Sequence, residues 1–121
     1  MLLAQPAAAQ SGIFDADRLL QMCAESSCVD GVQISVGQIL LLRLPPEEFN
    51  SQLGVIASVL FQAAKTADQV LADQLALGLR SLSKYSTDAV QRQSFFRVAE
   101  LVSNGSSELF DLNAPFAVSP S

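Results

Sequence analysis

The chain has 121 residues, of which 50% are hydrophobic and 16% are charged. A chain of this length forms one domain and can bury a hydrophobic core without the help of disulfide bonds or bound metals. The hydrophobic content excludes intrinsic disorder, which requires low hydrophobicity together with high net charge. The 7 basic and 12 acidic residues give a net charge of −5, which disfavours binding to the phosphates of nucleic acid.

Residues 1–10, MLLAQPAAAQ, resemble the end of a secretory signal. Ala7 and Ala9 occupy the small-residue positions of an A-x-A cleavage site. A basic segment and a full apolar stretch are missing, so we expect the true start upstream and a mature chain that begins at Gln10 or one residue later. The alternative is an alanine-rich terminus of a cytosolic protein. We therefore expect a signal remnant at 1–10, a single helical domain at 11–121, and a periplasmic or secreted protein.

The 2 cysteines, Cys23 and Cys28, agree with export. On one regular helix their side chains would point away from each other, because each residue turns the helix by about 100°. A disulfide therefore requires the first helix to end near Ala24 and the chain to reverse through Ser26 and Ser27. We expect this disulfide, with two free thiols as the alternative. The chain has no histidine, and two thiolates supply only half of a zinc site, so we expect no metal.

The first half of the chain predicts helices separated by clear breaks. Asp15 is a suitable N-cap for a short helix that includes Cys23. The segment from Val32 to Leu44 is ambiguous: its first apolar residues alternate as in a strand, whereas the whole segment also carries a helical apolar stripe. We favour a helix, since no second strand exists to pair with it. Pro45 and Pro46 then break the chain and start the next helix.

The helix from Pro46 to Lys65 is apolar around most of its circumference, which is typical of a central helix packed on several sides. Its narrow polar stripe consists of Ser51, Ser58, Gln62 and Lys65. The polar groups and a length of about 18 residues argue against a membrane span.

The second half of the chain predicts two more long helices. Thr66 and Gln69 match a capping box that starts the first of them, and Ser81 lies on the side assigned to water. Thr87 or Asp88 caps the second, which Gly105 ends. The prolines of residues 111–121 predict an extended C-terminal tail. The fold class is therefore all-α: a compact single-domain bundle of about five helices around a central apolar helix.

The sequence contains no convincing catalytic or cofactor-binding motif. Histidine, the commonest general base, is absent, and no nucleophile elbow or phosphate-binding loop occurs. The adjacent Glu47 and Glu48 are favourable at a helix N-terminus and are not placed as an acid–base pair. Arg92 and Arg97 beside two phenylalanines are interpreted as a solvated helix face. We expect no enzyme activity, no cofactor and no nucleic-acid partner.

Four consecutive large apolar residues, Ile39, Leu40, Leu41 and Leu42, form the candidate interaction surface. On a helix they would point to all sides, so an incompletely enclosed helix would present some of them to a partner. The alternative is that all four belong to the core. We expect a small exported helical protein that acts by protein–protein interaction, as an accessory or structural subunit or by self-association. The alternative function is a carrier of a small apolar ligand or lipid in a cavity between the helices.

Overall fold

The computed structural model describes residues 14–105. The predicted signal cleavage at Ala7, Ala9 and Gln10 and the predicted C-terminal tail lie outside these residues. Within them the chain is all-α and forms no strand, as expected. The helices are α2 (Ala16–Glu25), α3 (Cys28–Leu40), α4 (Pro46–Ala64), α5 (Gln69–Ser83) and α6 (Ala89–Asn104).

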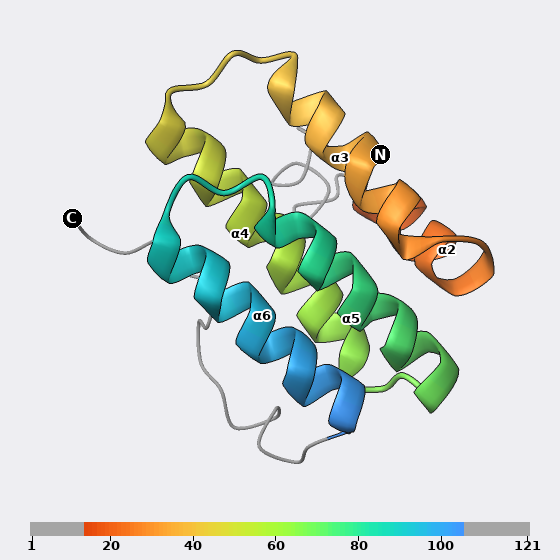
Figure 1. Cartoon of the computed structure of the whole chain (residues 1–121). Helices are drawn as coiled ribbons and strands as arrows, with labels where there is room; N and C mark the ends of the chain where they lie inside the picture. Colours follow the sequence, from red (N-terminus) through yellow and green to blue (C-terminus); the bar gives the residue numbers. More distant parts are fainter. Residues whose placement is uncertain (1–13, 106–121) are drawn as a thin grey trace.

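The helices pack as two neighbouring hairpins that are joined by α4 (Figure 1). The α2–α3 pair packs along one side of α5, and α6 packs along the other side. Helix α4 lies behind α5 and α6 in this view. The segment from Val32 to Leu44 is helical as far as Leu40, which settles the ambiguity of its apolar pattern in favour of the helix.

Most helix ends lie where the capping residues in the sequence predict them. Asp15 caps α2, since its Oδ1 accepts a hydrogen bond from the Arg18 amide at 3.1 Å. Asp88 caps α6 through a 2.9 Å hydrogen bond from the Val90 amide. Gly105 ends α6 with a φ of 65°, the left-handed conformation that glycine adopts without steric cost.

The start of α5 differs from the prediction. The capping box from Thr66 to Gln69 does not form, because the residues after Ala64 hydrogen-bond back to the last turn of α4. The cap is Asp68, whose Oδ1 accepts a hydrogen bond from the Leu71 amide at 2.9 Å. The chain needs these extra residues to reverse direction, and aspartate is as good an N-cap as threonine.

The core is centred on α4 and α5, each of which contacts all the other described helices. The predicted central position of α4 is therefore confirmed and is shared with α5. Leu60 of α4 and Leu79 of α5 are completely buried. The prediction that Ser81 faces water is wrong: its side chain is buried, because α3, α4 and α6 pack around α5 and leave it only a narrow exposed stripe.

A buried polar network fastens the start of α4 to the loop between α5 and α6. The Asn50 side chain donates to Thr87 Oγ1 at 2.8 Å and accepts from the Thr87 amide at 3.1 Å. Gln91 is fully buried, and its Nε2 donates to the Asn50 carbonyl at 2.9 Å. Its Oε1 accepts from Ser86 Oγ at 2.6 Å. These partners satisfy a glutamine that would be costly to bury alone.

Candidate interaction surfaces

The disulfide joins the last turn of α2 to the first residue of α3. Cys23 and Cys28 are bonded, with their Cα atoms 3.8 Å apart, and both side chains are buried. Helix α2 ends at Glu25, so the chain reverses at the serines as the sequence predicted. The Cys28 amide donates to Gln74 Oε1 at 3.1 Å, which ties this junction to α5. The disulfide is therefore a structural bond within the core and not a reactive group on the surface.

We expect Cys23 and Cys28 to be disulfide-bonded in protein purified from an oxidising compartment. Alkylation must be performed in denaturant, because burial would shield even free thiols. Mass spectrometry should then find no alkylated cysteine, and a mass lower than that of reduced protein by two hydrogens. Alkylation at both positions in such material would contradict the disulfide and weaken the case for export.

The candidate interaction surface divides into one core residue and three exposed ones. Ile39 is fully buried, so its assignment to the surface is corrected. It continues the core-facing stripe of α3 from Val36, three residues earlier. Leu40, Leu41 and Leu42 are 56%, 82% and 48% exposed. They are exposed because α3 ends at Leu40 and the chain turns away from the core. We call Leu40–Leu42 the leucine turn.

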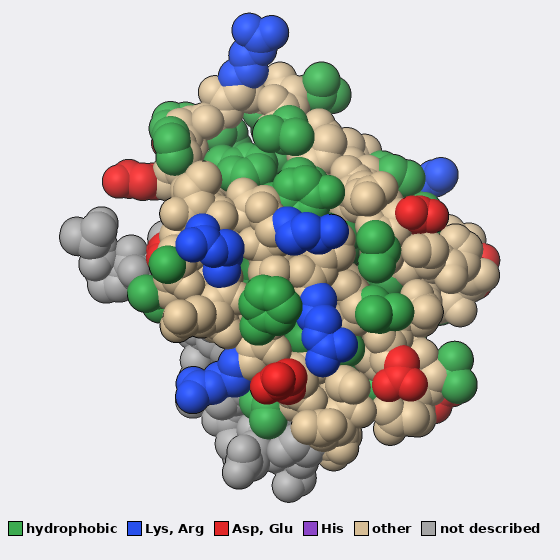
Figure 2. Space-filling view, viewed as in Figure 1, with side chains coloured by type: hydrophobic (Ala, Val, Ile, Leu, Met, Phe, Trp, Pro, Cys, Tyr) green, Lys and Arg blue, Asp and Glu red, His purple; other side chains and the backbone are tan. Residues whose placement is uncertain are grey.

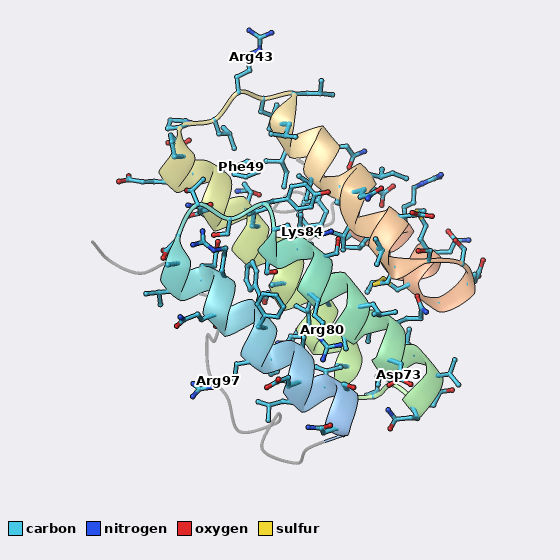
Figure 3. All side chains as sticks on the ribbon, in the orientation of Figure 1. Arg43, Phe49, Asp73, Arg80, Lys84 and Arg97 are labelled. Atoms are coloured by element: carbon cyan, nitrogen blue, oxygen red, sulfur yellow. A yellow bond between two sulfur atoms is a disulfide. The ribbon has the colours of Figure 1, made fainter. Side chains whose placement is uncertain are left out.

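The leucine turn has a defined backbone. The Leu42 amide donates to the Ile39 carbonyl at 3.0 Å, and the Arg43 amide donates to the Leu40 carbonyl at 3.1 Å. Arg43 has a φ of 53° and is the one non-glycine residue with positive φ among residues 14–105. A left-handed conformation is costly for a residue with a Cβ atom, and such strain is common at functional sites. Arg43 projects beyond the end of the bundle (Figure 3).

Two hollows in the described part of the molecule differ from an apolar ligand cavity. One, between α2 and α3, has a volume of about 10 Å³, which is room for a single water. The other has a volume of about 530 Å³ and lies beside the disulfide. It is open to solvent, and Glu25, Thr66 and Asp68 contribute to its walls.

The described residues offer little for metal binding or membrane insertion. No group of three or more histidine, cysteine, aspartate or glutamate side chains is placed to hold a metal ion within residues 14–105. Over the same range, no helix combines the length and the apolar character that a membrane crossing needs. Glu47 and Glu48 are exposed in the first turn of α4, where they favour the helix dipole.

Two features of the structure do not follow from the sequence pattern. The structural role of Gln91 is one, because a buried glutamine has no signal in a helical pattern until its partners on α4 are known. The exposed position of Phe96 between Arg92 and Arg97 was interpreted only as part of a solvated helix face. Phe95 is buried, as its place in the helical pattern predicts, and Phe96 is 49% exposed.

Comparison of the chain with protein-family models, with curated proteins and with solved structures found no match. The class of protein that its own structure defines is an all-α bundle of five described helices with a buried disulfide between α2 and α3.

Proposed function

We propose that the protein is an exported binding subunit that contacts a partner protein through the leucine turn. The observation that carries this proposal is the exposure of three consecutive leucines, with Leu41 at 82%. Water-exposed apolar area is unfavourable by roughly 25 cal/mol per Å², so covering these side chains supplies binding energy. Charge is depleted in the cores of protein interfaces, and the leucine turn itself carries none.

Two further features support this function. The disulfide suits an oxidising compartment such as a bacterial periplasm or the exterior of the cell. The hydrogen bonds within the turn hold its leucines in place before binding, which lowers the entropic cost of association. The alternative role as a lipid carrier has weaker support, since the larger hollow is open and partly polar.

Leu41→Glu should leave the domain folded and abolish partner binding. An exposed position tolerates a carboxylate, whereas the core of an interface does not. Circular dichroism melts of the variant and wild type should coincide. Partner contact is measured in the native host with a photoreactive phenylalanine analogue at position 42, with and without Leu41→Glu. One crosslinked species of defined mass should form, and the substitution should remove it.

Val70 provides the matched control for this experiment. It is 77% exposed and lies at the first turn of α5, away from the leucine turn. A photoreactive residue at position 70 should not yield the same species, and Val70→Glu should not remove the crosslink at position 42. The same species at both positions, or none at position 42, would overturn the proposal.

A further inference from the structure

The exposed sides of the neighbouring helices α5 and α6 together form one surface with an ordered arrangement of charge. We call it the α5–α6 face. On each helix its residues recur at the three- and four-residue spacing that lines up one side of a helix. It consists of Asp73, Leu77, Arg80 and Lys84 from α5, and Arg92, Phe96 and Glu100 from α6. Apolar groups and basic side chains meet across this view of the molecule (Figure 2).

The charges of this face separate toward its two ends. Gln69 Nε2 donates to the Ser103 carbonyl at 3.1 Å, so the start of α5 lies beside the end of α6. Asp73 and Glu100 therefore share one end of the face. Lys84 and Arg92 share the other end, next to the short loop that joins the helices. Figure 3 shows the same order along α5, from Asp73 through Arg80 to Lys84.

The middle of the face is apolar. Leu77 on α5 is 44% exposed and Phe96 on α6 is 49% exposed. Arg80 lies between the two ends of the face and is half-buried. The acidic and basic positions are about 16 Å apart along α5 and about 12 Å apart along α6, at a rise of about 1.5 Å per residue. The apolar centre is thus flanked by opposite charges at similar distances.

We propose that two copies of this chain pair through their α5–α6 faces about a two-fold axis that lies in the interface and runs across the helices. A half turn about this axis brings the second face onto the first and exchanges its acidic and basic ends, so each helix packs against the same helix of the second copy. Lys84 then meets Asp73 of the second copy, and Arg92 meets Glu100 of the second copy. Phe96 lies at the axis against Phe96 of the second copy, and Arg80 lies against Leu77 of the second copy. Every contact away from the axis is made twice, as a two-fold interface requires.

Charge complementarity favours a second copy over other occupants. The described residues contain no salt bridge that pairs Arg80, Lys84, Asp73 or Glu100 within the chain. A nucleic acid or an anionic membrane would meet the two carboxylates of the same face and a protein of net charge −5. A second copy neutralises both ends at once, without requiring a partner of different sequence.

The size of the face sets the strength expected of this dimer. Helices α5 and α6 have 15 and 16 residues, and two helices side by side are about 20 Å wide. The area of the two helices is roughly 450 Å² on each copy, or about 900 Å² in the dimer, which is below the standard size and typical of weak, transient interfaces. We therefore expect a dissociation constant in the micromolar range, with weaker binding as ionic strength rises.

A charge exchange tests the proposed pairing directly. Lys84→Glu alone and Asp73→Lys alone each create two like-charge contacts in the dimer, so each should weaken self-association roughly tenfold or more. An equimolar mixture of the two variants restores opposite charges at both contacts and should form a heterodimer. Sedimentation velocity over a micromolar concentration series measures all three samples. Recovery in the mixture also shows that both single variants are folded.

The controls separate this pairing from a general effect of net charge. Arg18→Glu and Glu48→Lys make the same charge changes at exposed positions on α2 and α4, and should leave the dimer unchanged. Phe96→Ser should weaken it, because the centre of an interface contributes most of the binding energy. A wild-type protein that stays monomeric through the micromolar range would overturn the proposal. A mixture that stays monomeric would overturn it equally.

This inference goes beyond the proposed partner-binding function and is independent of it. The leucine turn lies between α3 and α4, so Leu41→Glu should leave the dimer unchanged. Conversely, Lys84→Glu should leave the partner crosslink at position 42 unchanged. Each proposal can therefore fail while the other stands.

Discussion

Leu60→Ala should lower the free energy of unfolding by about 2–5 kcal/mol, the range for truncating a fully buried leucine. Leu60 has no exposed surface and lies on α4, which contacts all the other described helices. Because helices pack against α4 on several sides, the surrounding side chains have little freedom to move into the cavity that the substitution would leave. Chemical denaturation followed by circular dichroism measures the change, provided that the dependence on denaturant is the same in both proteins.

Val55 provides the control on the same helix. It is 37% exposed, so Val55→Ala removes fewer buried contacts and should cost about 1 kcal/mol or less. If Leu60→Ala cost no more than Val55→Ala, then α4 would not occupy the centre of the bundle.

Gly78→Ala should destabilise the protein by about 1–3 kcal/mol, the usual cost of overpacking a core. A Cβ atom at this position would lie 2.7 Å from Cys28 Sγ, inside van der Waals contact. The sulfur is held by the disulfide and fully buried, so it cannot move aside cheaply. Gly37→Ala in α3 should have the opposite effect. Nothing lies within 4 Å of its added Cβ, and the change stabilises a helix by up to about 1 kcal/mol.

Removal of the sulfur tests whether it is the cause of this destabilisation. In a Cys23→Ala, Cys28→Ala background, Gly78→Ala should cost less than in the disulfide-bonded protein, because the clashing atom is gone. Thermal melts of the four proteins give the comparison. An equal cost of Gly78→Ala in both backgrounds would show that the sulfur does not limit the approach of α3 and α5.

Signals that act over a few residues allowed much of the fold to be predicted. Asp15, Asp88 and Gly105 satisfy or terminate their own helix ends, so the residue type alone indicates the role. The spacing of Cys23 and Cys28 required a chain reversal at the serines, and the structure has it there. These features depend on local geometry, which a sequence displays directly.

Features set by the packing of distant segments could not be predicted in this way. Ser81 is buried because helices pack around α5 on several sides, and the periodicity of α5 alone does not report how many there are. The burial of Ile39 and exposure of Leu41 depend on where α3 ends. The prediction placed all four apolar residues on one continuous helix, whereas α3 ends at Leu40 and the next two leucines lie in the turn that follows.

The α5–α6 face also depends on the packing of separate segments and could not be predicted from either helix alone. The pattern of α5 gives the stripe from Asp73 to Lys84, and that of α6 gives the stripe from Arg92 to Glu100. Neither pattern says that the stripes lie on one face with like charges at the same end. That arrangement follows from the short antiparallel connection and from the contact between Gln69 and Ser103.

The hydrogen bonds of Asn50 bear on the order in which the domain assembles. The pairs α2–α3 and α5–α6 are each joined by a short connection, so their contacts close at small entropic cost. Helix α4 is also joined to α5 by a short connection, but Asn50 reaches Thr87 and Gln91, which are 37 and 41 residues away in the chain. We therefore expect the contacts of α4 with α6 and its preceding loop to form after those between consecutive helices, as contacts of large sequence separation are slow to form. The buried amide groups of Asn50 and Gln91 find all of these hydrogen-bond partners only when α4 packs in the correct register.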